Sequence, residues 1–117
     1  MNLVLALTGA SGSYVAKSIM EKSKWPVTLI ASKMGRMVYE HEVGDFSVLE
    51  KLADQVWKDS DLSATVSSGS VPTVGMIVVP CSANTLGKVA NGIADSLVSR
   101  AAPVSYTHLR AHETSQN

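Results

Sequence analysis

The sequence predicts one α/β domain in which a parallel sheet lies between helices, giving three layers. Short runs that are apolar on both faces, such as Asn2 to Leu7 and Gly75 to Pro80, are typical of buried parallel strands. Segments with apolar residues at helical spacing separate these runs, as in consecutive βαβ units. At 117 residues, of which 45% are hydrophobic, the chain suffices for a single globular domain at most.

The elements follow from the apolar pattern and its breaks. Small residues after the first strand lead into a helix that Pro26 stops, and Phe46, Leu49 and Val56 recur at helical spacing. A run without apolar period over 67–73 predicts a loop. We therefore expect strands over 2–7, 27–31 and 75–80, and helices from Ser13, over 33–41, over 46–57, from 86 to 92 and over 95–100.

Composition excludes several classes of partner. Ten Lys plus Arg balance ten Asp plus Glu, and no basic run occurs, which argues against a nucleic-acid surface. The apolar runs fall short of the roughly 20 residues that span a bilayer. The start lacks the pattern of a signal peptide, and a single cysteine forms no internal disulfide. We expect a cytoplasmic protein without a membrane or nucleic-acid partner.

Small and polar residues follow three predicted strands. They are Gly9 to Ser13, Ser32 and Cys81 to Thr85. Because ligands of open parallel sheets bind outside the carboxyl ends of the strands, one pocket could collect all three segments.

The first of these loops has two interpretations. Gly9-Ala10-Ser11-Gly12 could cradle a phosphate on the N–H groups of the following helix. It could equally be a tight turn that needs small side chains. It is not a P-loop, which would end in Gly-Lys-Ser or Gly-Lys-Thr.

The remaining candidates are also open to a structural interpretation. Ser82 or Asn84 could be an ordinary helix N-cap as readily as a ligand contact. Cys81 is most simply a small buried residue at a strand end. Arg100 either complements a helix dipole or faces a phosphate or a polarised ring. No pair of histidines in the body has metal-ligand spacing, so no metal site is expected.

Several segments occur in a distinctive order: Leu7 to Gly12, Ala31 to Lys33, Ser68 to Ser70, Gly75 to Ser82 and Arg100 to Ala102. In this combination the chain resembles the flavin prenyltransferase family, the UbiX-like branch of the flavoprotein fold. The resemblance covers Asn2 to Ala102. It implies a flavodoxin-like or Rossmann-like sheet that is truncated at its C-terminal side.

The resemblance also implies a function. Such an enzyme transfers the dimethylallyl group of dimethylallyl phosphate to reduced FMN, closing a fourth ring through N5 and C6 without a metal. It would be a homo-oligomer that serves ubiquinone biosynthesis by supplying prenylated FMN to a partner decarboxylase. Two alternatives are an FMN-dependent decarboxylase of the same fold, acting on a cysteine-derived carboxylate, and a non-catalytic flavin-binding module.

The family's site residues carry over to named positions here. Proton transfer falls on Glu42, and Ser11 lies near the flavin N5. A carboxylate such as Glu42 suits the loss of a proton from C6. The residues implied to hold FMN are Gly9, Ala10, Ser11, Ser32, Ser82, Ala83, Asn84, Thr85 and Arg100.

The resemblance stops after Ala102. Residues 103–117 have no apolar period, and a nucleotide string that translates to Val104 through Thr114 resembles a transposase-adapter sequence used in preparing sequencing libraries. We therefore expect residues 1–102 to be an incomplete FMN-binding domain and residues 103–117 to be an artefactual, unstructured tail. His108 and His112 are then not a metal pair, and the chain itself is expected to be inactive.

Overall fold

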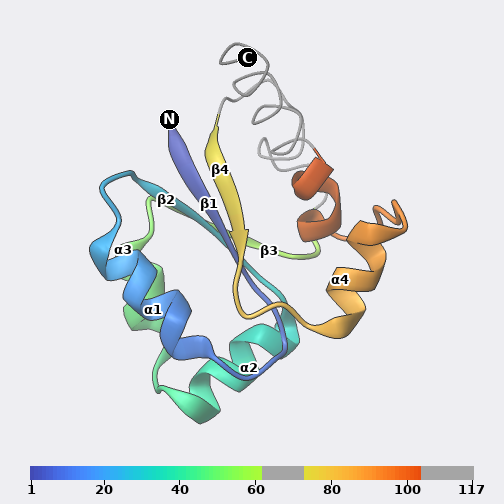
Figure 1. Cartoon of the computed structure of the whole chain (residues 1–117). Coiled ribbons are helices and arrows are strands. Elements are labelled where there is room, and N and C mark those ends of the chain that lie inside the picture. The colour runs from blue at the N-terminus through green and yellow to red at the C-terminus, as the bar shows by residue number, and fades with distance from the viewer. Residues whose placement is uncertain (62–72, 104–117) are drawn as a thin grey trace.

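The computed structural model describes residues 1–61 and 73–103, and its centre is a four-stranded sheet. The strand order is β3-β2-β1-β4, and every neighbouring pair runs parallel (Figure 1). The strands are β1 (Asn2–Leu7), β2 (Val27–Ala31), β3 (Gln55–Lys58) and β4 (Thr73–Val78). The helices are α1 (Ser13–Lys22), α2 (Lys33–Glu42), α3 (Phe46–Leu52) and α4 (Ala83–Ala90), and residues 97–103 are helical too.

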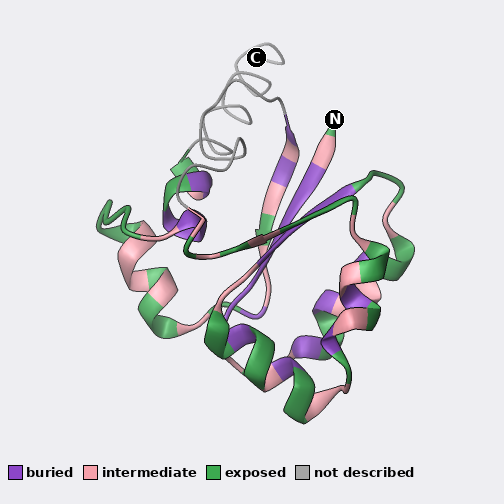
Figure 2. Cartoon of the chain, turned by 180° about the vertical axis from the view of Figure 1, so that it is seen from behind, coloured by how far each residue is buried: buried purple, intermediate pink, exposed green. Residues whose placement is uncertain are grey.

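Helices cover both faces of the sheet, which confirms the three-layer prediction. Side chains alternate between the two faces along a strand. Leu3, Leu5 and Leu7 of β1 therefore pack with residues of α1, α2 and α3. Val4 and Ala6 point the other way and pack against the helical residues 97–103. Buried residues accordingly concentrate on the inner strands and on the helix surfaces that face them (Figure 2).

The expected helix over 46–57 is wrong in its second half. α3 ends at Leu52, and Gln55–Lys58 form β3, which pairs in parallel with β2. Val56 continues the helical spacing of α3 by coincidence, while the strand is short and begins and ends in polar residues. Its pattern therefore carries no period of two, and pairing with β2 decides its conformation.

Other boundaries need smaller adjustments. β4 begins at Thr73 and ends at Val78, two residues before the expected ends. α2 extends to Glu42, and α4 begins at Ala83. Apart from Thr73, the expected loop over 67–73 lies outside the described residues, as do residues 104–117 of the expected tail.

Within the described ranges, no helix combines the length and the apolar character needed to cross a lipid bilayer.

Candidate functional site

Two of the segments predicted from sequence, 9–13 and 81–85, lie where the sheet changes its direction of winding. β1 leads into α1 on one face, whereas β4 leads into α4 and then into residues 97–103 on the other face (Figure 1). Because β1 and β4 are neighbours, the loops that follow them diverge at their carboxyl ends. In open α/β sheets this switch point is where ligands bind.

The N-terminus of α1 holds a carboxylate from α2. Ser11 Oγ donates to Glu42 Oε2 over 2.6 Å, and the backbone N–H groups of Gly12 and Ser13 donate to Oε1 over 3.1 Å each. Gly12 adopts a left-handed conformation with φ of 114°, which suits glycine at the turn into the helix. The loop thus closes around the last residue of α2.

These hydrogen bonds stabilise the ionised form of Glu42. The Ser11 hydroxyl contributes most, followed by the backbone N–H groups of Ser13 and Gly12, and together they lower the pKa of Glu42 from 4.5 to about 2. The ionised form is stabilised because each donor points at the negative charge and the helix dipole adds to the effect. Glu42 is therefore an anion at neutral pH.

This arrangement limits the phosphate-cradle interpretation of the first loop. The N–H groups of Gly12 and Ser13, which would meet a phosphate, already bind Glu42. Gly9 has a packing role, since a Cβ there would come within 2.6 Å of Met34 Cβ on α2. The exposed Ser11 hydroxyl is what this loop presents at the surface.

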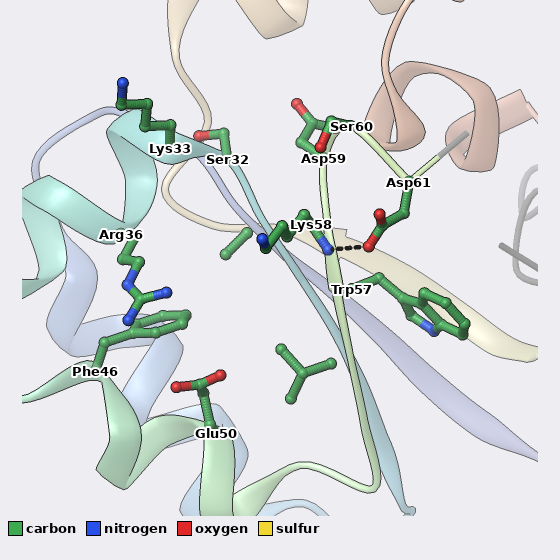
Figure 3. Close-up of a pocket in the computed structure, with 12 residues that line it drawn as sticks. Ser32, Lys33, Arg36, Phe46, Glu50, Trp57, Lys58, Asp59, Ser60 and Asp61 are labelled. Atoms are coloured by element: carbon green, nitrogen blue, oxygen red, sulfur yellow. Dashed lines mark hydrogen bonds between the residues drawn. The ribbon is translucent and has the colours of Figure 1, made fainter. Parts of the chain in front are cut away.

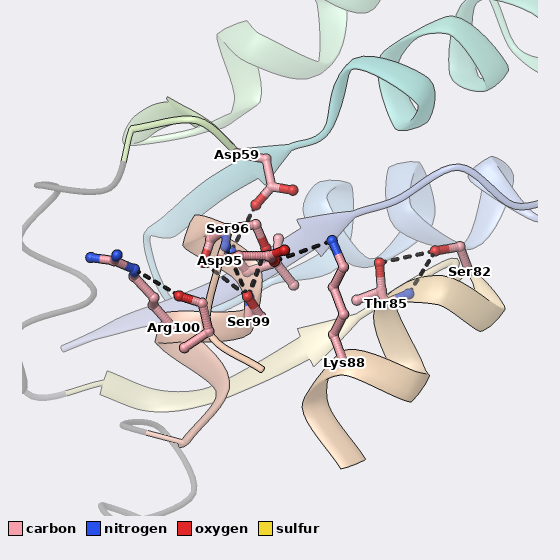
Figure 4. Close-up of polar contacts among 10 residues, drawn as sticks. Asp59, Ser82, Thr85, Lys88, Asp95, Ser96, Ser99 and Arg100 are labelled. Carbon is pink, nitrogen blue, oxygen red and sulfur yellow. Dashed lines mark hydrogen bonds and ion pairs between the residues drawn. The ribbon is translucent and has the colours of Figure 1, made fainter. Parts of the chain in front are cut away.

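In the loop over 81–85, Ser82 is the N-cap of α4, as one of its two interpretations predicts. Ser82 Oγ accepts from the backbone N–H of Thr85 over 3.1 Å and donates to Thr85 Oγ1 over 2.9 Å. The two hydroxyls therefore lie together at the start of α4 (Figure 4). Ala83 and Asn84, in the first turn, are exposed. Cys81 is exposed as well, so its interpretation as a buried residue is wrong.

Ser32 lies at the N-terminus of α2, where it accepts from Gly35 N over 2.9 Å. It also lines a cavity of about 780 Å³ between α2, α3 and β3 (Figure 3). The residues that line the cavity are Ala31, Ser32, Lys33, Arg36, Phe46, Glu50, Val56, Trp57, Lys58, Asp59, Ser60 and Asp61. Of the site residues predicted from sequence, this list includes Ser32 alone.

The charged side chains of this cavity are not among the site residues predicted from the sequence. Lys58 is the last residue of β3, and Asp59 and Asp61 follow it. They therefore lie at the carboxyl end of a strand, as Ser32 does. The apolar spacing over 46–57 predicts one helix, so the sequence does not predict that a strand ends at Lys58. Arg36 lies above the Phe46 ring, with the guanidinium carbon 5.0 Å from its centroid.

Arg100 lies apart from the Ser82 and Thr85 hydroxyls. Its Nε donates to Ala94 O over 3.0 Å, and its side chain extends away from α4 (Figure 4). Asp59 holds the helical residues that carry Arg100: its carbonyl oxygen accepts from Leu97 N and its Oδ1 from Val98 N, both over 2.8 Å. The switch point thus brings together Gly9 to Ser11, Glu42 and the Ser82 to Thr85 loop, but not Arg100.

Over the ranges that the structure describes, no cluster of three or more His, Cys, Asp and Glu side chains is arranged to hold a metal ion.

The amino-acid sequence of this chain is similar to those of several known proteins. The chain is 42% identical to the flavin prenyltransferase UbiX of Deinococcus radiodurans over 112 residues, covering 92% of this chain and 57% of the relative. It is 37% identical to the flavin prenyltransferase UbiX of Thermoplasma acidophilum, covering 94% of this chain and 62% of the relative. The chain thus spans less than two thirds of the length of these curated relatives.

Solved structures with the same fold include proteins that bind FMN. The crystal structure of AnUbiX (PadA1) in complex with FMN and dimethylallyl pyrophosphate superposes with a TM-score of 0.86 at 35% identity, covering 92% of this chain and 59% of that one. A dodecameric FMN-dependent UbiX-like decarboxylase from Escherichia coli O157:H7 gives a TM-score of 0.85 at 36% identity, covering 92% and 62%. The Flavoprotein family model matches residues 1–110, and this chain therefore belongs to the Flavoprotein family.

Proposed function

We propose that this chain is the FMN-binding part of a flavin prenyltransferase, which joins the dimethylallyl group of dimethylallyl phosphate to reduced FMN. The observation that carries the proposal is the Ser11–Glu42 pair at the carboxyl end of β1. It provides an ionised carboxylate and a hydroxyl at the switch point, where the family resemblance expects the flavin. When bound, FMN would supply the isoalloxazine ring that the dimethylallyl group joins at N5 and C6, and inorganic phosphate would leave as the C–O bond of dimethylallyl phosphate breaks.

The described residues suit FMN as a ligand. Its phosphate and ribityl hydroxyls need hydrogen-bond partners, and Ser82 and Thr85 provide hydroxyls at the N-terminus of the eight-residue α4. This end suits a phosphate better than the start of α1, which Glu42 already neutralises. We propose that the full binding set is Gly9, Ala10, Ser11, Ser32, Ser82, Ala83, Asn84, Thr85 and Arg100.

Arg100 lies apart from the Ser82 and Thr85 hydroxyls, so it would have to turn its terminal nitrogens toward them to enter this set. Its Nε is engaged by Ala94 O, which leaves the other guanidinium N–H groups as possible donors to the ring or to a phosphate. Because Asp59 anchors the helical residues that carry it, Arg100 would approach from the side of the sheet opposite α1.

Glu42 is the group we propose to accept the proton that leaves the ring carbon. A carboxylate with a pKa of about 2 is a weak base while three donors bind it. If Ser11 turns its hydroxyl toward a bound ligand, Glu42 loses its largest stabilising contact and its basicity rises. Ser11 would then both contact the cofactor and control the readiness of Glu42 to take a proton.

Mass spectrometry of the flavin tests this function. The protein is incubated under reducing, oxygen-free conditions with FMN and dimethylallyl phosphate, both as this chain and as the full-length product of its source gene. Prenylated FMN in the full-length reaction is the expected result. Unmodified FMN together with decarboxylation of a cysteine-derived carboxylate, added as a second substrate, would favour the decarboxylase, and bound FMN without either reaction would favour a binding module.

The cellular context of the enzyme is part of the same proposal. We propose a cytoplasmic homo-oligomer that supplies prenylated FMN to a partner decarboxylase in ubiquinone biosynthesis. The dodecameric state of a similar solved protein supports assembly. Sedimentation velocity of the full-length product gives its oligomeric state, and a monomer would contradict this part.

We also propose that residues 1–102 are an incomplete FMN-binding domain and that residues 103–117 derive from an adapter. A nucleotide string that translates to residues 104–114 resembles an adapter, which supports this boundary, although the family model continues to residue 110. Sequencing the source DNA across codon 102 tests it. A genomic reading frame that encodes the same 15 terminal residues would overturn the proposal.

A further inference from the structure

Thr8 links the two loops of the switch point through its side chain. It follows β1 directly and is 1% exposed. Its hydroxyl donates to Pro80 O over 2.6 Å and accepts from Ser82 N over 2.8 Å. Its backbone N–H also donates to Pro80 O, over 3.2 Å. One buried residue of the first loop therefore holds both ends of the turn that precedes α4.

This link holds Ser82, the residue that caps α4. No residue of α4 is buried, and the helix lies at the periphery of the domain (Figure 2). Packing against the sheet therefore contributes little to its position, and the hydrogen bonds at its N-terminus contribute more. Ser82, whose N–H binds Thr8, is also the residue whose hydroxyl caps α4 and contacts Thr85. A chain of hydrogen bonds thus runs from Thr8 to both hydroxyls.

We propose that Thr8 is a positioning residue for the flavin site. Its hydroxyl fixes the Ser82 and Thr85 hydroxyls relative to Ser11, three positions further along the first loop. The inference rests on the proposed function, because those hydroxyls are the ones assigned to FMN. Thr8 itself is buried beneath the two loops and acts through Ser82 without touching the cofactor.

The Thr8→Val substitution tests the role of the hydroxyl. Valine has nearly the same shape but leaves Ser82 N without its acceptor, so the turn can move. We expect FMN affinity, measured by quenching of flavin fluorescence, to fall by about tenfold or more. Thr8→Ser keeps the hydroxyl and should stay within about threefold of the wild type, since both hydrogen bonds can reform.

Thr28→Val is the matched control. Thr28 is also a buried threonine with a hydrogen-bonded hydroxyl, which accepts from Asn2 Nδ2 over 3.0 Å. It lies near the amino end of β2, whereas the two loops follow the carboxyl ends of β1 and β4. Its substitution should lower stability without changing FMN affinity, which separates a general loss of stability from a loss of positioning.

Amide hydrogen exchange gives a readout that does not depend on FMN. In Thr8→Val the Ser82 N–H should exchange about tenfold faster or more, while in Thr28→Val it should not change. Unchanged exchange at Ser82 in Thr8→Val, or unchanged FMN affinity in that variant, would overturn the positioning role. Failure of the wild-type chain to bind FMN would instead refute the proposed cofactor site.

Discussion

Ser11 Oγ lies 2.6 Å from Glu42 Oε2 and joins residues 31 positions apart in the sequence. The contact exists because α2 ends beside the start of α1. Gly35 permits this approach, since a Cβ at that position would overlap the carbonyl oxygen of Leu7 at the end of β1. The close packing of α2 on the sheet thus places a carboxylate at the site.

Replacing Glu42 by glutamine should separate binding from turnover. The amide oxygen of glutamine can still accept from Gly12 and Ser13, so the loop should remain closed and FMN should still bind. Without a carboxylate to accept a proton, formation of prenylated FMN by the full-length product should fall by about 100-fold or more. Product formation at the wild-type rate would remove Glu42 from the mechanism.

The low pKa of Glu42 predicts a specific pH dependence. Because folding lowers its pKa from 4.5 to about 2, the ionised form stabilises the native state above pH 4.5, and this contribution disappears as the pH falls toward 2. The difference in stability between wild type and Glu42→Gln, from urea unfolding at each pH, should be constant at neutral pH and change across this window.

Removing the Ser11 hydroxyl should move the same titration. In Ser11→Ala, Glu42 loses the donor that contributes most, so its pKa should rise toward 4.5. NMR titration of the Gly12 and Ser13 amides reports the midpoint directly. A midpoint that stays near 2 would mean that the backbone N–H groups alone determine the pKa of Glu42.

Two arginines can locate the flavin. If FMN occupies the switch point and Arg100 turns its terminal nitrogens toward it, Arg100→Ala should weaken FMN binding by about tenfold, whereas Arg36→Ala should have little effect. Arg36 lines the cavity of about 780 Å³ between α2, α3 and β3 and lies over Phe46. The opposite result in a fluorescence titration would place the flavin in that cavity.

Asp59 should stabilise the helical residues 97–103 through its Oδ1, which accepts from Val98 N. Asp59→Ala should lower the free energy of unfolding by about 1 kcal/mol, as for other lost N-terminal caps. Asp59→Asn keeps an equivalent oxygen and should cost much less. Equal losses in the two variants, measured by urea unfolding, would show that the charge matters more than the cap.

A pair of glycines tests the packing of α2. Gly35→Ala should lower stability by about 3 kcal/mol, because the added methyl group forces α2 away from β1. Gly87→Ala in α4 meets no atom within 4 Å and should raise stability by about 0.5 to 1 kcal/mol. A Gly35→Ala protein as stable as the wild type would show that α2 can shift without cost.

Part of this fold can be predicted from the local sequence. β1 and β2 begin and end as their apolar runs predict, because a strand buried on both faces must be apolar throughout. Ser32 and Ser82 cap the helices that follow them, because a cap needs only a hydroxyl and an N–H three residues further on. The candidate loops were found for the same reason, since each directly follows a predicted strand.

Tertiary structure alone decided the rest. β3 takes its conformation from hydrogen bonds to β2, so its own residues show no strand pattern. Glu42 acquires its low pKa from donors on another helix, and Thr8 bonds to Pro80 and Ser82 across more than 70 residues. Such contacts depend on how α2 and β4 lie against β1. The local sequence therefore identified the segments of the site, and packing determined which of their groups meet.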